Sequence, residues 1–240
     1  MTADRWTRVV REQLGLGRLL PLGGPRDGAW IAESAAESIL RRAVEGVPGV
    51  RLGPLRIAPA GPDGTGEPAV PAPPSALPPG PLRVTADFTA SGTEPLPSAA
   101  SRLRTALAGA AAEAVGLAVA EVDLRVTGLG EEEPGDEGRT PADASDAREQ
   151  QGDEASVADA ARAVPGVSRL TGTLGGLGRA VHIEERQEGA ASLPRRHVRV
   201  ELAVRSGHRA LTVAREVRTA VTAALPDSPS VAVLVTAADL

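Results

Sequence analysis

The stretch Val198-Arg199-Val200-Glu201-Leu202-Ala203-Val204-Arg205 decides the fold class of this 240-residue chain. Its large apolar side chains recur at every second position, while Arg199, Glu201 and Arg205 lie between them. A period of two predicts a half-buried β-strand with one face in water. Residues 82–89 repeat the pattern, and there we expect the inward set to be Leu82, Val84, Ala86 and Phe88.

An amphipathic helix is expected after each of these strands, and a further strand after each helix. The second helix has apolar residues at steps of three and four, and Pro226 ends it. The first is expected from about Ser98 to a C-cap at Gly116. The closing strands are 122–126 and 231–235, of which the second is apolar throughout and therefore predicted to be central.

Each unit opens with a short helix that ends in the same four residues. These are Val47-Pro48-Gly49-Val50 and Val164-Pro165-Gly166-Val167, in which the Pro-Gly step stops a helix. We therefore predict an α+β fold made of two α-β-β-α-β repeats, each a small antiparallel or mixed sheet with helices on one face. An extra strand at 179–185 is expected in the second copy, where the first copy has a Pro-rich linker.

Composition divides the chain into an N-terminal amphipathic segment, a first repeat, an acidic linker and a second repeat. The predicted limits are 1–22, 27–127, 128–152 and 153–240, with a Pro-rich disordered insert at 59–81. Ten acidic residues and two arginines lie between Glu131 and Glu154, so this stretch carries a charge of −8. The rest of the chain carries +3, which gives the net charge of −5. The predicted folded parts therefore lack the basic footprint of a nucleic-acid-binding protein.

Several classes of site are excluded by residues that the chain lacks. Without Cys there are no disulfides, thiolate metal sites or Cys nucleophiles. Neither a Gly-x-Ser-x-Gly elbow nor a His-Glu-x-x-His motif is present. We therefore expect no enzyme, no catalytic residues and no cofactor. No apolar run approaches the ~20 residues that span a bilayer, and the N-terminus is too charged for a signal peptide, so we expect a cytoplasmic protein without a transmembrane segment.

Three weaker candidates have simpler interpretations. Zinc needs three or four ligands, and the chain offers His182, His197 and His208 without Cys, so we predict no metal. The glycine-rich stretch 172–178 is followed by a strand and not a helix, so we predict a hairpin turn and not a phosphate loop. Sheet-type RNA modules stack bases on aromatic side chains, and Phe88 is predicted to face the core, so we expect no nucleic-acid partner.

The N-terminal segment is the predicted contact surface for a partner or membrane. An apolar stripe, continued by Leu19, Leu20 and Leu22, faces away from a row of arginines, as in an interfacial helix. Whether this helix binds a membrane, a partner or its own first domain is left open. The predicted contact residues are Trp6, Val9, Val10, Leu14, Arg5, Arg8 and Arg11.

The order of motifs in 156–237 resembles the alkaline-shock-protein family of bacterial envelope-stress proteins. The matching motifs are Val157-Ala158-x-Ala160-Ala161, Val164-Pro165-Gly166-Val167, Val198-x-Val200-x-Leu202-x-Val204, Gly207 before a helix with Val213, Val217 and Val221, and Val231-x-Val233-x-Val235. The chain departs from the family at Ser206-Gly207, where an aromatic-Gly is usual, and at Ala232, where Asn is usual. Related two-copy chains also carry a nucleopolyhedrovirus P-ten-like label, which implies no function.

The resemblance implies a non-enzymatic scaffold or interaction protein that is envelope-associated, stress-related and recruited to the inner face of the cell membrane by a partner. We expect a protein partner, with a membrane-anchored partner and self-association both left open. The alternative is a nucleic-acid- or small-ligand-binding regulatory protein. The absence of Lys and Asn beside abundant Arg, Ala, Gly and Pro is typical of a high-GC bacterium.

Overall fold

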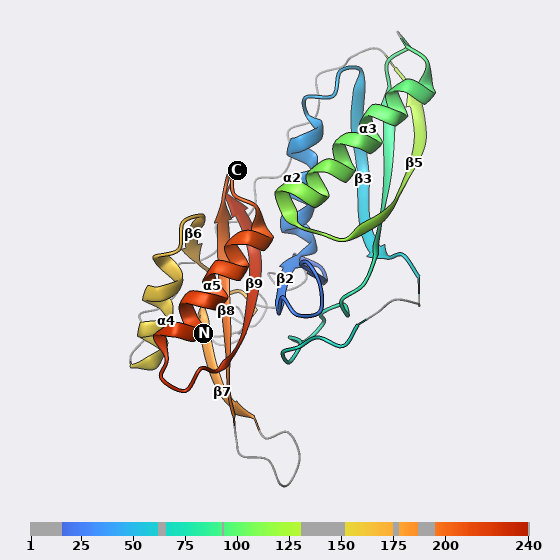
Figure 1. The fold of residues 1–240 in the computed structure, drawn as a ribbon. Helices are drawn as coiled ribbons and strands as arrows, with labels where there is room; N and C mark the ends of the chain where they lie inside the picture. The colour runs from blue at the N-terminus through green and yellow to red at the C-terminus, as the bar shows by residue number, and fades with distance from the viewer. Residues whose placement is uncertain are drawn as a thin grey trace, which may run out of the picture.

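The computed structural model describes residues 16–61, 66–92, 94–130, 152–174, 178–186 and 195–239. Within these residues the chain is a mixed α+β protein with four α-helices and two sheets, one of six strands and one of three. Figure 1 shows the two sheets in separate halves of the molecule, with β2 beside the helices of the N-terminal half.

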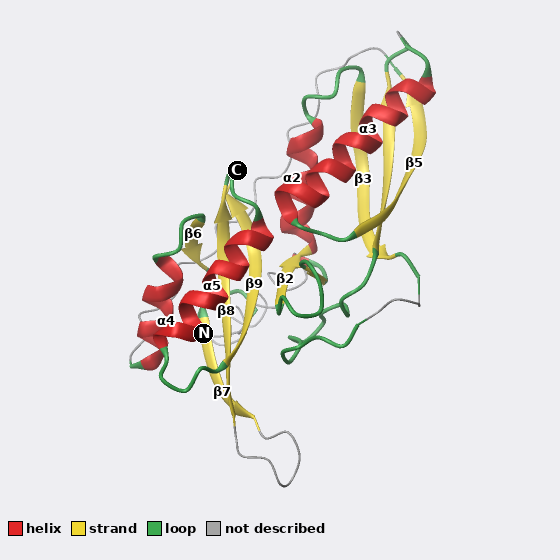
Figure 2. Ribbon diagram, in the orientation of Figure 1, coloured by secondary structure: helices red, strands yellow, loops and turns green. Residues whose placement is uncertain are grey.

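The three-stranded sheet has the order β3-β4-β5 and carries its helices on one side (Figure 2). β3 runs antiparallel to β4, and β5 runs parallel to β4. A parallel connection needs a crossover, which α3 and a following π-helical turn, η1, provide. The elements of this half are α2 (Glu33–Val44), β3 (Val50–Pro59), β4 (Leu82–Ala90), α3 (Leu96–Ala110), η1 (Ala111–Val115) and β5 (Val119–Leu129).

The six-stranded sheet has the order β1-β2-β9-β8-β6, and β7 also pairs with β8. β2 joins it in parallel to β9, with Trp30 beside Leu234, so a strand that precedes α2 belongs to the sheet of the C-terminal half. Helices α4 and α5 lie on one side of this sheet (Figure 2). Its elements are β1 (Leu19–Pro21), β2 (Ala29–Ala32), α4 (Asp153–Arg162), β6 (Val167–Leu170), β7 (Val181–Arg186), β8 (Arg195–Arg205), α5 (Ala210–Ala224) and β9 (Ser230–Asp239).

β6 and β7 do not form the hairpin that the glycine-rich stretch predicts. Both strands pair antiparallel with β8, β6 at Val204–Leu202 and β7 at Val200–Arg195. They therefore run in the same direction and follow each other along one long strand, so the hairpin prediction is wrong. The eleven residues of β8 offer enough edge for both segments.

The alternating pattern predicts the inward faces of β4 and β8 correctly. Leu82, Val84, Ala86 and Phe88 are at most 1% exposed, and Val84 and Val200 are both fully buried. The outward face of β8 is not wet as predicted, because Glu201 is also fully buried. The segment after β6 lies against this face, where the Leu174 N–H donates to the Glu201 carboxylate at 2.9 Å.

The segment around Leu19 is a strand and not a continuation of the N-terminal helix. β1 pairs antiparallel with β2, and Leu19, Leu20 and Leu22 are at most 2% exposed. Gly17, with a φ of 69°, turns the chain immediately before β1. The helical prediction for these leucines is therefore wrong, because a place beside β2 buries all three.

Part of the Pro-rich segment, for which composition predicts disorder, packs beside β1 and β2. The Leu77 N–H donates to the Leu19 carbonyl at 2.8 Å, and the Trp30 indole donates to the Leu77 carbonyl at 3.4 Å. Val70 is also buried, at 6% exposed. The extended Pro-rich segment therefore covers Trp30, which is 1% exposed.

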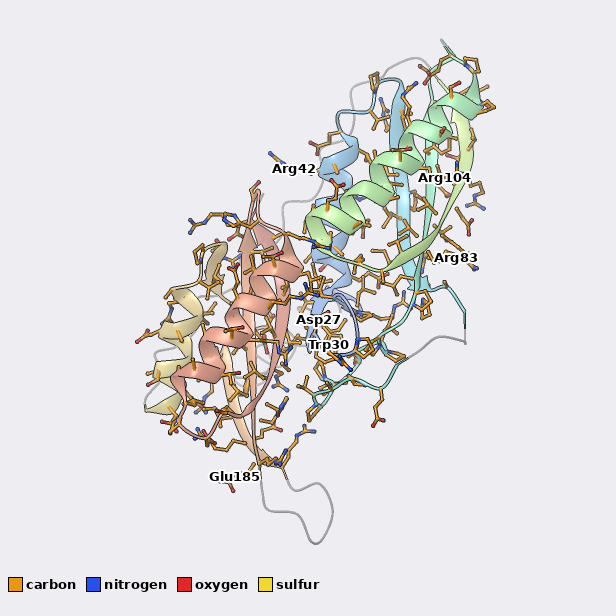
Figure 3. All side chains as sticks on the ribbon, in the orientation of Figure 1. Asp27, Trp30, Arg42, Arg83, Arg104 and Glu185 are labelled. Carbon is orange, nitrogen blue, oxygen red and sulfur yellow. The ribbon has the colours of Figure 1, made fainter. Side chains whose placement is uncertain are left out.

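A continuous apolar core extends through both halves, and polar contacts join them. Arg215 of α5 forms two hydrogen bonds with the Asp27 carboxylate, at 2.7 and 3.1 Å. Arg218 of the same helix donates to the Arg26 carbonyl oxygen at 2.9 Å, and within the C-terminal half it also donates to the Val231 carbonyl oxygen at 3.1 Å. Burial raises the pKa of Asp27, but the hydrogen bonds from Arg215 and the Gly24 N–H bring it below its ordinary value. Figure 3 shows Asp27 at this junction.

Candidate functional site

The predicted N-terminal contact residues lie outside the described part of the chain. Trp6, Val9, Val10, Leu14, Arg5, Arg8 and Arg11 all precede residue 16, where the description begins. Their role as a partner or membrane contact stays a prediction. Of the nearest described residues, Leu16, Leu19 and Leu20 are buried, while Gly17 and Arg18 are exposed.

The three histidines occupy separate environments. His182 and His197 lie on the neighbouring strands β7 and β8, and burial lowers the pKa of both. His182 Nε2 lies 3.1 Å from the Arg179 carbonyl oxygen, and His197 Nδ1 lies 2.8 Å from Ser230 Oγ. His208 precedes α5, away from both. Among the described residues, no three His, Asp or Glu side chains are grouped to hold a metal ion.

Glu201 is the most perturbed acid of the described chain, and the sequence pattern did not reveal it. One carboxylate oxygen accepts hydrogen bonds from the Leu174 N–H at 2.9 Å and the Thr173 hydroxyl at 3.4 Å. The other, Oε1, is buried and has no hydrogen-bond partner among the described residues. Burial raises the pKa of Glu201 to about 7, although the Leu174 hydrogen bond and the charge of Arg199 oppose the rise.

The surroundings of Glu201 are polar but closed to solvent. The hydroxyl groups of Thr171 and Thr236 lie 2.5 Å apart. Arg199 Nε and Arg169 Nη1 are buried and have no hydrogen-bond partner in the part of the chain that the structure describes. A carboxyl with a pKa near neutrality can act as a general base, but only where a substrate reaches it. Because Glu201 is 0% exposed, we interpret this cluster as structural. An apolar run without alternation, such as that of β9, indicates a strand buried on both faces. It was therefore the sequence signal that the sheet face carrying Glu201 is covered as well.

A cavity of about 330 Å³ lies between the two halves. The N-terminal half contributes Ile39 and the η1 turn, and the C-terminal half contributes the end of β8 and the loop before α5. Arg209 Nε donates to the Ala112 carbonyl at 3.1 Å across this boundary. The lining combines apolar residues with Arg205 and Arg209, which suit a small anion, and with the acidic Glu113. The lining residues are Ile39, Glu113, Ala114, Val204, Arg205, Ser206, Gly207, His208, Arg209 and Ala238.

The two edges of the three-stranded sheet differ in how well they are closed. On β3, Ile57 accepts from Arg18 at 2.6 Å and donates to Glu33 at 3.4 Å, while the Gly53 carbonyl accepts from Arg41 at 2.9 Å. A register shift between Leu52 and Leu55 also interrupts this strand. Bulges and side chains that occupy backbone groups protect an edge from pairing. The β3 edge is therefore closed to another strand.

Within the described residues, the outer edge of β5, a strand of eleven residues, has no neighbouring strand. Among the described strands β5 pairs with β4 alone. Val126 and Leu129, at 39% and 65% exposed, are the large apolar side chains that stand exposed within the described chain. Arg104 of α3 donates from Nε to the Val122 carbonyl at 3.2 Å. Long edge strands with apolar side chains are sites at which another chain can add a strand.

The sheet face opposite the helices is charged and wet. Arg83 lies 2.6 Å from Glu121 and 3.4 Å from Asp123, and Arg125 lies 2.9 Å from Asp87. The hydrogen bond from Arg125 holds the pKa of Asp87 below its ordinary value. Figure 3 shows Arg83 and Arg104 on the outer side of this half. The apolar surface is thus confined to the edge and does not extend over the face.

No family model, curated protein or solved structure matches this chain. Within the described residues, no helix combines the length and the apolar character needed to cross a bilayer. The interpretation of function therefore depends on the geometry described above, in which the β5 edge is the most accessible candidate site.

Proposed function

We propose that this chain is a non-enzymatic scaffold or interaction protein that acts through protein partners. The observation that carries this proposal is the open β5 edge, with Val126 and Leu129 exposed, in a sheet whose other edge is closed. Strand addition at such an edge gains affinity from backbone hydrogen bonds and specificity from alternate side chains. This function needs no reacting group. It is consistent with the burial of the Glu201 carboxyl group, which solvent does not reach.

We also infer that residues 33–129 and 153–239 are two copies of one α-β-β-α-β unit. Both have a helix, antiparallel segments, a crossover helix and a strand parallel to the one before it. Val84 and Val200 occupy comparable places, each buried between an antiparallel and a parallel neighbour. On this alignment, β7 corresponds to the second part of β3, not to the Pro-rich segment.

The proposed setting is the inner face of the bacterial cell envelope under stress, reached through a partner that is itself membrane-anchored. The support is the resemblance of 156–237 and the Arg- and Trp-containing N-terminal segment. A single short amphipathic helix binds membrane weakly, so stable recruitment needs a second contact. The β5 edge is suited to supply that contact.

The proposal is tested by comparing proteins captured from native membranes by wild-type chain and by two variants. Val126→Lys places a charge on the exposed apolar edge, while Thr127→Lys changes the exposed residue beside it. We expect Val126→Lys to lose the captured proteins and Thr127→Lys to keep them. Identical captured sets from wild type and Val126→Lys would refute the edge as the partner site.

A regulatory protein that binds a small anion is the second candidate, and the cavity beside Arg209 favours it. Inorganic phosphate would then raise the thermal unfolding temperature of wild type but not of an Arg209→Ala, Arg205→Ala variant, because a ligand that binds only the folded state stabilises it. An equal temperature shift in both chains would remove this candidate.

A further inference from the structure

Residues Val122 to Val126 have a sequence that complements itself in the antiparallel direction. The order is Val-Asp-Leu-Arg-Val, so reversing it exchanges Asp123 with Arg125 and leaves the apolar positions unchanged. Two copies of this segment placed antiparallel therefore put opposite charges across from each other. Opposite charges at facing positions of a strand pair stabilise it, while like charges destabilise it.

The backbone of this segment is correctly oriented for such pairing. Two register shifts in the β4–β5 pairing, at Leu82/Arg83 and Phe88/Thr89, bracket a regular stretch from Glu121 to Val126. The Val122 carbonyl accepts from Arg104, which lies on α3, and so points away from β4. Because backbone direction alternates along a strand, the N–H and C=O groups of Leu124 and Val126 point outward as well.

We propose that a second copy of this chain docks antiparallel on β5, with Leu124 on the two-fold axis. This docking rests on the proposed function, because it names a partner for the same edge. Val122 then faces the partner's Val126, and Asp123 faces the partner's Arg125. Each apolar and each charged pair occurs twice, as two-fold symmetry requires. The two three-stranded sheets become one continuous six-stranded sheet, and the exposed Val126 gains an apolar neighbour.

The neighbouring registers are unfavourable. An axis at Asp123 places two aspartates opposite each other, and an axis at Arg125 places two arginines opposite each other. Only the axis at Leu124 puts Asp123 and Arg125 at facing non-hydrogen-bonded positions, where side chains are closest. The contact from Arg104 is compatible with this pairing, because a carbonyl oxygen has two lone pairs.

The first test is the mass of the full chain in solution, measured by light scattering with size exclusion. Wild type is expected to approach twice 24.4 kDa as concentration rises. Asp123→Arg places arginine at both charged positions, and Arg125→Asp places aspartate at both, so each variant alone should stay at 24.4 kDa. An equimolar mixture of the two variants restores opposite charges and should restore the double mass.

The mixture also separates a pairing defect from a folding defect. Arg125→Asp breaks the ion pair with Asp87, and Asp123→Arg adds charge near Arg83, so circular dichroism of each variant is the folding control. A chain that has lost its fold is not rescued by its complement. A wild type that stays at the single mass, variants that dimerise like wild type, or a mixture that does not dimerise would each overturn the proposal.

The second test uses the absence of cysteine from the chain. Leu124→Cys puts two thiols on facing residues whose Cα atoms are about 5.5 Å apart in a hydrogen-bonded pair, within the range for a disulfide. Oxidation should link this variant into a dimer. Thr127→Cys, whose expected neighbour is the partner's Glu121, should not link to itself. Equal linking of both variants, or of neither, would contradict the register.

The two proposals can fail separately. A wild type that stays at the single mass, while Val126→Lys still loses captured proteins, refutes self-pairing and leaves the interaction function in place. Wild type at the double mass with no captured protein supports self-pairing and refutes the function through other partners.

Discussion

At the residue scale, the buried carboxyl group of Glu201 makes stability depend on pH. Its pKa is raised from 4.5 to about 7 in the folded protein. Between these values the unfolded chain releases its proton first, so the folded state holds more protons and stability falls as pH rises. The penalty is absent below about pH 4.5 and complete above about pH 7.

Glu201→Gln should therefore stabilise the protein at high pH. The variant keeps an oxygen to accept from the Leu174 N–H but cannot ionise. Its gain in unfolding free energy should be small at pH 5 and up to about 3 kcal/mol at pH 8. Urea unfolding of both chains at the two pH values measures this difference. A gain that does not change with pH would show that folding does not raise the pKa of Glu201.

Sequence patterning identified Val84 and Val200 as buried but placed Glu201 in water. A period of two assigns residues to faces and does not say which face is covered. The covering segment includes Thr173 and Leu174, which belong to the stretch 172–178 that the sequence assigned to a hairpin turn. The edge position of Asp123 and Arg125 was equally hidden, because strand order depends on contacts between distant segments.

At the element scale, the end of the α3–η1 helix depends on a close approach between the two halves. Gly116 has a φ of 98°, and a Cβ atom there would lie 2.4 Å from the Cβ of Leu211 on α5. Gly207 has a similar φ of 81° with open space around it. The two glycines therefore separate backbone strain from crowding.

Gly207→Ala should cost roughly 1 kcal/mol of unfolding free energy, the expense of a left-handed backbone. Gly116→Ala should cost roughly 1–3 kcal/mol more, because α5 must also move to admit the methyl group. Thermal or urea unfolding of the two variants measures the difference. Equal costs would show that Leu211 does not pack against Gly116 as described.

The helices were better predicted than the strands at this scale. Gly116 is the C-cap that its position indicated, and the 210–224 helix follows its apolar spacing. The π-helical turn before Gly116 has no sequence signature. β1 was missed because three leucines near a predicted helix suit either structure, and only the position of β2 decides between them.

At the scale of the whole molecule, the two halves should unfold together. β2 lies in the C-terminal sheet, and Arg215 pairs with Asp27 across the junction. In a Trp6→Phe background, the fluorescence of Trp30 should change in the same urea transition as the far-ultraviolet circular dichroism. Separate transitions would mean that each half is stable alone and that β2 detaches first.

Composition and periodicity predicted the mixed α+β class and the position of most elements, but not the six-stranded sheet. Its assembly pairs residues 29–31 with 233–235, a contact that no local pattern encodes. The same reason explains why the open β5 edge could not be found from sequence. An edge is defined by the absence of a neighbouring strand, which depends on the arrangement of the whole sheet.

The most direct test of the interaction function is photo-crosslinking in cells from a single position on β5. A photoreactive amino acid at Val126, on the open edge, is compared with one at Thr85, which is exposed on the wet face of β4. The account predicts discrete protein adducts from position 126, including a dimer of this chain, and none from position 85. The same adducts at both positions, or none at 126, would contradict it.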